Sequence, residues 1–232
     1  MREPEGLGRD FLTEEGPTLA VRRYRDRLLG RLGLEAGKGR RALDLGCGDG
    51  MEAVWLAERG WKVEAFDLES HPRWQRLAKE SKGRIRFATA DAAQLGSLKK
   101  PYDLVFQKDM LHHVPDPEAV LRAMKRLTAP GGTAVVLECN RLNPIFYGHL
   151  TLMRGHQHFT LPRLRALLQT AGMGSYSLKR IEARVWPLES LGFQNLMERM
   201  QDLAEALPFW RPFICYHAAL WKPEAGSKKG MK

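Results

Sequence analysis

A glycine-rich turn follows a short apolar run near residue 45. Residues 41–45 form the run, and Gly46, Gly48 and Gly50 then occupy alternate positions directly before a helical pattern. A strand, a glycine turn and a helix can hold a ligand close to the backbone N–H groups at the start of the helix. Glycines are needed because a side chain would keep the ligand away from the backbone. The pattern therefore predicts a ligand-binding turn.

Two common phosphate-binding patterns fit this turn poorly. A phosphate loop needs a lysine followed by Ser or Thr, and neither follows Gly50. A dinucleotide-binding turn needs a third glycine at the position that Met51 occupies. The sequence thus favours a ligand without a pyrophosphate.

Three acids accompany the turn. Asp44 lies two residues before the first glycine, Asp67 ends the second apolar run, and Asp91 follows the third. A carboxylate at the end of the second strand can accept hydrogen bonds from both hydroxyls of a ribose. Because like charges repel, three acids suit a ligand with a ribose, an adenine and a positive centre better than a pyrophosphate.

A further polar group follows the fourth apolar run, at residues 102–106. Its members are Gln107, Lys108, Asp109, His112 and His113. His113 or His112 is the best candidate for a catalytic base, because histidine titrates near neutral pH. The same pair could instead cap a helix or fill a pocket wall.

His156 and His158 stand one residue apart in a long connection. This spacing suggests metal ligation, but no acid or cysteine stands nearby at ligand spacing, and the sequence predicts no metal site. Their place after the fifth strand favours a lid over the substrate.

The elements that position these residues alternate along the chain. Strand-like runs occur at residues 41–45, 61–67, 85–88, 102–106 and 133–138, with helical patterns between them. This alternation predicts an α/β fold, with a doubly wound, mostly parallel sheet and helices on both faces.

Shorter signals refine the boundaries. The first helix is expected at residues 18–34, and a turn at 130–132. Asp116 is the expected N-cap of a helix whose first residue is Pro117, and Gly60 the expected end of the helix before it.

The pattern after the fifth strand is less regular. Helices are expected to follow Thr160 and to cover residues 191–207, the latter with Leu196, Met200 and Leu203 in register. Strands are expected at 175–185 and 213–221.

Taken together, the motifs resemble those of the class I S-adenosylmethionine-dependent methyltransferases. The run ALDLGCGDG at residues 42–50 resembles the first motif of that family, and the acids in AFDL and TADA follow in the family's order. The segments YDLVFQKDMLHHVPDP at 102–117 and LTAPGGTAVVLE at 127–138 resemble the motifs that come next. The resemblance covers residues 18–180 and is strongest to quinone, sterol and other small-molecule methyltransferases.

The resemblance implies a seven-stranded sheet with an antiparallel last strand, and S-adenosylmethionine as cofactor. By this resemblance, the methionyl part of the cofactor would lie against Asp44, Gly46, Cys47 and Gly48. The ribose would be held by Asp67, and the adenine face would be covered by Leu68. The adenine edge would contact Asp91 and Ala92, and the reacting methyl would lie near Gln107.

The expected function is methyl transfer to a small, partly apolar acceptor, on oxygen, nitrogen or carbon. An RNA methyltransferase is the main alternative, although residues 107–110 lack the Pro-Pro-aromatic motif of base amino methylation and a nucleophilic cysteine. A non-catalytic scaffold of the same fold would be expected to have lost the glycines and acids that this chain retains.

Composition bears on partners and location. The formal net charge is +10, and basic residues concentrate at 22–41 and near the end of the chain. They suit solvated helix faces or contact with a polyanion, and the former is favoured. Peripheral membrane contact through the first helix and the apolar segment 145–153 is a further expectation. The first 17 residues lack the apolar core of a secretion signal, and three sparse cysteines suit a reduced, cytoplasmic protein.

The expected organisation is a single methyltransferase domain over residues 1–232. Within it we expect an N-terminal segment at 1–17, a substrate lid at 140–160 and a flexible tail at 223–232. The sequence does not specify an oligomeric state.

Overall fold

The fold is taken from a computed structural model of the chain. It describes residues 12–13, 16–95, 100–153 and 155–223. Most of the predicted N-terminal segment and nearly all of the predicted tail lie outside these residues.

A seven-stranded sheet organises the described chain. Its strands lie in the order β5 (Ile85–Thr89), β4 (Lys62–Asp67), β3 (Arg41–Leu45), β6 (Tyr102–Lys108), β7 (Thr128–Cys139), β9 (Tyr216–Trp221) and β8 (Tyr176–Ile181). The first five strands in this order run parallel, and β9 is antiparallel to both of its neighbours. The predicted doubly wound sheet with an antiparallel last strand is confirmed. A separate ladder of β1 (Leu12–Thr13) and β2 (Gly16–Pro17) was not predicted.

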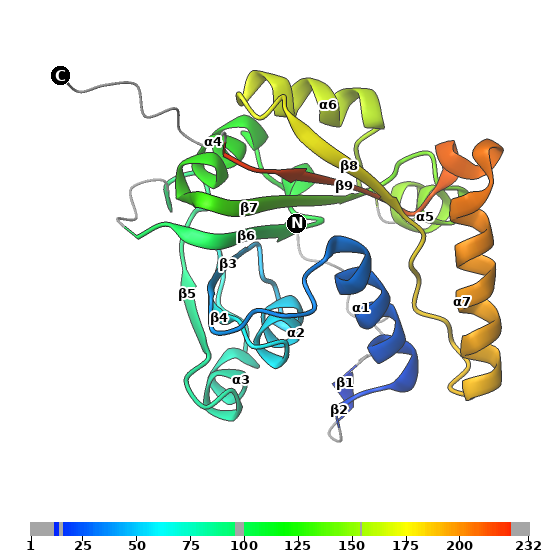
Figure 1. The fold of residues 1–232 in the computed structure, drawn as a ribbon, viewed down its shortest axis with the longest axis horizontal. Coiled ribbons are helices and arrows are strands. Elements are labelled where there is room, and N and C mark those ends of the chain that lie inside the picture. Colours follow the sequence, from blue (N-terminus) through cyan, green and yellow to red (C-terminus); the bar gives the residue numbers. More distant parts are fainter. Residues whose placement is uncertain (1–11, 14–15, 96–99, 154, 224–232) are drawn as a thin grey trace.

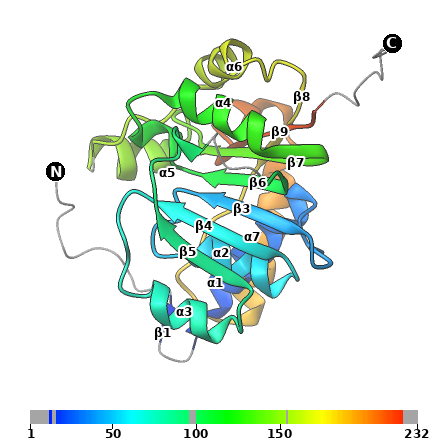
Figure 2. The ribbon, with the colours of Figure 1, turned by 90° about the vertical axis from the view of Figure 1, so that its left-hand side faces the viewer.

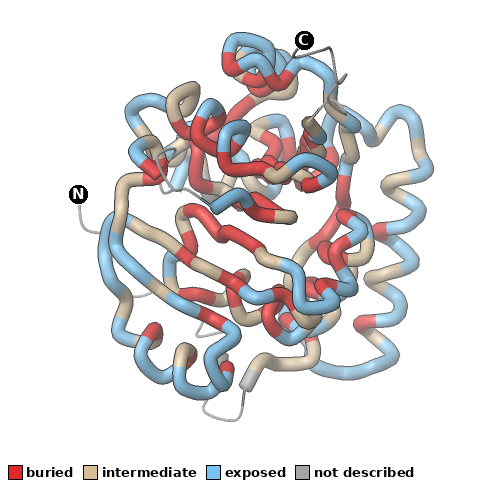
Figure 3. Tube along the Cα trace, turned by 60° about the vertical axis from the view of Figure 1, so that its left-hand side comes forward, coloured by how far each residue is buried: buried red, intermediate tan, exposed pale blue. Residues whose placement is uncertain are grey.

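Helices cover both faces of the sheet (Figures 1 and 2). One face carries α4 (Pro117–Leu127) and α6 (Leu161–Thr170), and the other carries α1 (Leu19–Leu32), α2 (Met51–Glu58) and α3 (Trp74–Glu80). Because successive strand side chains point to opposite faces, Val135 and Leu137 of β7 belong to one core, and Ala134 and Val136 to the other. The central strands are therefore apolar on both faces, and Figure 3 shows them as mostly buried.

The order of the strands creates a switch point beside β3. The chain proceeds from β3 to β4 and β5 on one side, and β6 then returns to pair with β3 on the other side. In doubly wound sheets, ligands bind at such a point, just beyond the carboxyl ends of the strands. The residues that follow β3, β4 and β6 are thereby brought to one edge.

Several element ends follow the predicted signals. The Asp116 side chain accepts a hydrogen bond from the Ala119 N–H at 2.8 Å, and Pro117 is the first residue of α4. Gly60 adopts a φ of +87° just after α2. The first helix is shorter than expected, because Gly33 ends it in the left-handed conformation.

Three strand boundaries were predicted wrongly. The expected turn at 130–132 is an irregularity within β7, since Tyr102 pairs with Thr128 and Leu104 pairs with Thr133. The added residues of β7 bulge while the ladder continues on both sides. The strand expected at 175–185 is the shorter β8, which ends at Ile181. The strand expected at 213–221 begins only at Tyr216, because the preceding residues form the 3₁₀ helix η4 (Pro208–Phe213).

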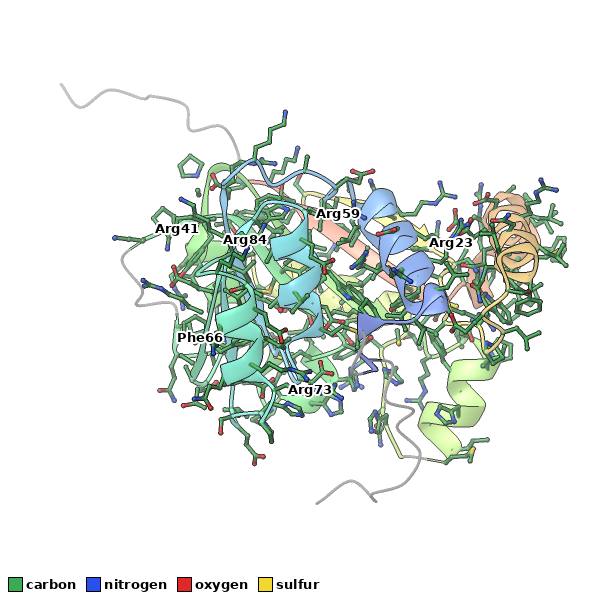
Figure 4. All side chains as sticks on the ribbon, turned by 90° about the horizontal axis from the view of Figure 1, so that it is seen from below. Arg23, Arg41, Arg59, Phe66, Arg73 and Arg84 are labelled. Atoms are coloured by element: carbon green, nitrogen blue, oxygen red, sulfur yellow. The ribbon has the colours of Figure 1, made fainter. Side chains whose placement is uncertain are left out.

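The helix α7 (Leu191–Ala206) packs against α1 with its polar side. Leu196, Met200 and Leu203, which the sequence aligns on one face, are half-exposed. The side toward α1 instead carries acids that pair with arginines: Arg23 with Glu198, and Arg27 and Arg31 with both Asp202 and Glu205. Figure 4 shows Arg23 lying between the two helices. These arginines are therefore not on the solvated face that we expected.

Within the described residues, no helix combines the length and the apolar character that crossing a membrane requires.

Candidate active site

The glycine turn is tightly packed at one end and open at the other. Gly46 and Cys47 donate their N–H groups to the Phe66 carbonyl at 2.8 and 3.1 Å, which fixes the turn against β4. Gly46 has a φ of +69°, and a Cβ there would meet Met110 Cγ at 2.3 Å. Gly48 has a φ of +50°, and a Cβ there would meet nothing within 4 Å. The turn thus leaves open space at Gly48.

Asp67 lies beside this turn, as predicted for a ribose-binding acid. Its Oδ2 accepts the Gly48 N–H at 2.8 Å, and its Oδ1 accepts the Leu68 N–H at 2.7 Å. Each oxygen keeps acceptor capacity beyond the bond it makes. Leu68 is 65% exposed next to the carboxylate, as an apolar cover for a ligand ring requires.

Asp44 and Gln107 lie on the paired strands β3 and β6, and both are buried. The Oδ2 of Asp44 and the Nε2 of Gln107 have no hydrogen-bond partner among the described residues. Burial, together with the charge of Glu52, raises the pKa of Asp44 well above its ordinary value. In the strand register Asp44 lies opposite Phe106 and Gln107 lies opposite Leu45, so the two side chains point to opposite faces of the sheet. Buried polar atoms are rarely left unpaired, so each of the two atoms is a candidate contact for a polar ligand.

Each of these two atoms has the chemistry to contact the methionyl end of S-adenosylmethionine beyond the strand ends. A carboxylate oxygen can accept from an ammonium group, and an amide N–H can donate to a carboxylate. The open space at Gly48 and the placement of Asp67 fit the rest of that molecule.

The other predicted cofactor residues are less open to a ligand. The Asp91 carboxylate accepts the Ala93 N–H at 2.9 Å and the Gln94 side-chain amide at 3.2 Å, so it already stabilises the turn after β5. Ala92 is buried in the core. Cys47 is also buried, and burial raises the pKa of its thiol. Contacts of these residues with the cofactor stay predictions.

A cluster of charged side chains lies at the carboxyl end of β6. Lys108 Nζ is 3.1 Å from Asp109 Oδ2 and 3.3 Å from Glu52 Oε1. Asp109 Oδ1 accepts the Cys139 N–H at 2.8 Å. Burial opposes ionisation of Asp109, but Lys108 and this hydrogen bond hold its pKa below the ordinary value. Asp109 adopts a φ of +51°, an uncommon conformation outside glycine that is often found at functional sites.

A buried carboxylate orients one of the predicted catalytic histidines. His112, on the turn η2 (Leu111–His113), has its Nδ1 2.9 Å from Glu138 Oε2. Glu138 Oε1 accepts the Leu111 N–H at 2.9 Å. Burial raises the pKa of Glu138, and its contact with His112 opposes this rise.

Four histidines from two distant segments meet beside this pair. The His112 ring centroid is 4.0 Å from that of His113 and 4.2 Å from that of His158, and the His113 and His156 rings are 4.9 Å apart. Burial and the neighbouring His112 lower the pKa of His158 to about 4, so its ring is neutral at pH 7. The structure thus joins the histidines after β6 to those of the predicted lid.

Glu138 is a site residue that the sequence analysis did not single out. It stands near the end of the buried strand β7, just as Asp67 and Gln107 stand at the ends of β4 and β6. An acid near the carboxyl end of a parallel strand was a usable signal. The run of apolar residues before it masked that signal.

The strand order, the glycine turn and the unpaired groups at the switch point define a class I S-adenosylmethionine-dependent methyltransferase. Residues 19–177 match a family model described as a methyltransferase domain. The chain belongs to this methyltransferase family.

Among curated proteins, the chain is similar to bacterial enzymes named ubiquinone biosynthesis O-methyltransferase. The one from Pseudomonas aeruginosa (strain LESB58) is 32% identical over 148 residues, which are 60% of this chain and 62% of that protein. The one from Aeromonas salmonicida is 38% identical over 112 residues, 47% of each chain. The matches therefore span less than two thirds of the length of either relative.

Solved structures share the fold at lower identity. A methyltransferase from Archaeoglobus fulgidus described as SAM-dependent aligns with a TM-score of 0.62 at 18% identity, covering 89% of this chain and 95% of its own. The 1,6-didemethyltoxoflavin-N1-methyltransferase of Burkholderia thailandensis aligns with a TM-score of 0.57 at 22% identity, covering 93% and 83%. At these identities the likeness concerns the fold.

Proposed function

We propose that the chain transfers a methyl group from S-adenosylmethionine to a hydroxyl oxygen of a small, partly apolar acceptor. The observation that carries this proposal is the presence of two unpaired buried groups, on Asp44 and Gln107, near the strand ends at the switch point, with a histidine cluster beyond β6. When bound, the cofactor supplies a methyl group on a sulfonium, which is reactive toward nucleophiles without further activation. The protein then has to bind the cofactor and the acceptor, orient them toward each other and deprotonate the acceptor hydroxyl.

Cofactor binding falls to residues of three strand ends. Asp44 would accept hydrogen bonds from the amino group, and Gln107 would donate to the carboxylate of the methionyl part. Asp67 would accept from the ribose hydroxyls, and Leu68 would cover the adenine. The open turn at Gly48 lets the ligand approach the backbone.

His113 is our candidate for the base. A hydroxyl must lose its proton to become a good nucleophile, and a neutral imidazole can accept it. The His113 ring is exposed and lies against His112, whose position is fixed by Glu138. In this proposal His112 is a positioning residue.

The connection at 140–160 would cover the acceptor. Its residues His156 and His158 contact the histidines of η2. Its apolar side chains Ile145, Leu152 and Met153 are exposed. An apolar acceptor, or the membrane surface that holds one, would contact these side chains. The O-methyltransferase names of the curated relatives support an oxygen acceptor. The free cysteines suit a cytoplasmic reaction.

The acceptor class is tested with matched probes. The purified chain is incubated with S-adenosylmethionine and 4-octylcatechol, 4-octylphenol or 4-octylaniline, and products are identified by mass spectrometry and NMR. We expect a methyl ether from a phenolic probe. Methylation of the aniline alone would contradict an oxygen acceptor. In a parallel incubation with RNA, methylation of the RNA but of none of the three probes would favour the alternative function.

The role of His113 is tested by His113→Ala. Loss of a general base is expected to lower kcat by about 10²- to 10⁴-fold while the Kd for the cofactor is unchanged. His71→Ala is the matched control, because His71 lies in the loop before α3 and bonds only locally, to the Arg73 N–H. An unchanged kcat for His113→Ala would remove this residue from the mechanism.

A further inference from the structure

We infer that His112, His156 and His158 form a binding site for a divalent transition-metal ion such as Zn²⁺. Each residue offers one ring nitrogen, and these three nitrogens all lie within 4.8 Å of one another. Two of the ligands come from the segment after β7 and the third from the turn after β6. The sequence predicted no metal here because neither segment alone provides a ligand set.

The environment of His112 is that of a metal-binding histidine. Its Nδ1 is held at 2.9 Å by the buried carboxylate of Glu138, which leaves Nε2 as the coordinating atom. Metal-ligating histidines almost always donate their second ring N–H to a carboxylate, a carbonyl or a water, and this contact fixes the tautomer and the ring orientation. Glu138 would play that part here.

His158 provides an independent observation. It is 2% exposed, and neither of its ring nitrogens has a hydrogen-bond partner among the described residues. A buried imidazole that leaves both nitrogens unpaired is costly. Coordination of one nitrogen would remove much of that cost, and His112 lies directly against the ring.

The ligand type selects the metal. Imidazole nitrogens suit zinc and its neighbours, whereas magnesium and calcium prefer oxygen. Zinc lies about 2.0–2.1 Å from such nitrogens, so the ligands must approach to about 3.4 Å from one another. The three rings would therefore have to close around a bound ion, and His156 lies half-buried on the connection. Three histidines leave one coordination position open, as in catalytic zinc sites.

A second set of groups overlaps the first. Asp109, Cys139 and His158 also present ligand atoms within 4.8 Å of one another. Both oxygens of Asp109 are already engaged, one by the Cys139 N–H and the other by Lys108. We therefore assign the ion to the three histidines.

The role of the ion rests on the proposed function, but its binding does not. The open position lies in the same histidine cluster as His113, the candidate base. A hydroxyl bound there would lose its proton more readily, because a metal ion acts as a Lewis acid.

The test uses the full chain without a histidine tag, stripped of metal by a chelator. Calorimetric titration with Zn²⁺ is expected to show one site per chain. Co²⁺ is expected to give the visible absorption of a four-coordinate ion without a thiolate charge-transfer band. His156→Ala and His158→Ala should each weaken binding by at least the 10- to 100-fold expected for Glu138→Gln, which removes only the negative charge beside His112.

His71→Ala is the control variant and should bind Zn²⁺ with the same affinity as the parent protein. Circular dichroism checks folding, and His156→Ala, being half-buried, keeps the test valid if His158→Ala unfolds. No zinc binding, or binding that His156→Ala leaves intact, would overturn the assignment. A thiolate band lost in Cys139→Ser would also overturn it, by moving the ion to the second set. Cofactor titration on the same sample separates this result from failure of the proposed function.

Discussion

At the scale of single residues, Asp67 has a structural and a predicted binding role. In the structure its two oxygens hold the Gly48 and Leu68 N–H groups, and this fixes the carboxylate at the edge of the glycine turn. The acceptor capacity that remains on these oxygens would serve a ligand without breaking either bond. A carboxylate that is already held in place loses little conformational entropy when it binds a ligand.

Replacing Asp67 by alanine tests this role. The loss of two charged hydrogen bonds, each contributing about 1.5–3 kcal/mol, is expected to weaken S-adenosylmethionine binding about 100-fold or more. Calorimetry measures the Kd. Glu69→Ala, an equal change of charge at an exposed neighbour, should leave it unchanged. Equal affinities of Asp67→Ala and the parent would refute the assignment.

The buried acid Asp44 predicts a dependence of cofactor affinity on pH. Burial raises its pKa, so as the pH falls Asp44 takes up a proton earlier than an ordinary aspartate. Only the ionised form attracts the ammonium group of the cofactor. Affinity should therefore weaken with falling pH while the fold is still intact. In Asp44→Asn it should be lower and independent of this titration, and the same pH profile in both proteins would argue against the role.

At the scale of elements, the glycine turn combines two separate constraints. Gly46 and Gly39 both have positive φ, at +69° and +76°, but only at Gly46 would a Cβ collide with a neighbour. Comparing substitutions at Gly39 and Gly46 therefore separates the cost of backbone strain from the cost of steric overlap.

Urea unfolding of two alanine variants measures these constraints. Gly39→Ala should lower the free energy of unfolding by about 1–2 kcal/mol through the left-handed backbone alone. Gly46→Ala should cost about 1–3 kcal/mol more, because its Cβ overpacks against Met110. Equal losses would mean that Met110 moves aside freely and that the turn is not tightly packed.

Elements with strong local signals could be predicted from the sequence. Asp116 and Pro117 begin α4 because they satisfy the unpaired N–H groups of a helix start, and this chemistry is local. The orientation of α7 could not be predicted, because its leucines and its acids both lie at helical spacing. Only the arginines of α1, about 175 residues earlier, decide which face turns inward.

At the scale of the whole molecule, the basic character is partly neutralised within the fold. Arg27 is a clear case: its side chain is 10% exposed, it pairs with Asp202 and Glu205, and its Nε donates to the Glu182 carbonyl at 2.6 Å. The net charge therefore overstates the surface that α1 offers to a polyanion.

Arg27→Ala measures how much the ion pairs of Arg27 contribute to the free energy of unfolding. Loss of its charged hydrogen bonds is expected to lower the free energy of unfolding by about 1.5–3 kcal/mol. Arg22→Ala, an exposed position on the same helix, should change it by less than about 0.5 kcal/mol. Denaturation of both variants checks the difference. Similar values would show that the α1–α7 pairs contribute no stability.

The site was predictable where it depends on the order of the strands. Asp44, Asp67 and Gln107 lie at the ends of parallel strands, and the topology alone brings them to one edge. The meeting of His112 with His158 was not predictable, because it depends on how the long connection after β7 folds, with its short helical segments α5 (Pro144–Phe146) and η3 (Tyr147–Leu152).

Calorimetric titration of the purified chain with S-adenosylmethionine, S-adenosylhomocysteine and NAD tests the central claim most directly. The unpaired groups of Asp44 and Gln107 and the open turn at Gly48 predict binding of the first two at one site per chain, and none of NAD. Absence of binding to both adenosyl compounds, or comparable binding of NAD, would contradict the assignment of this site.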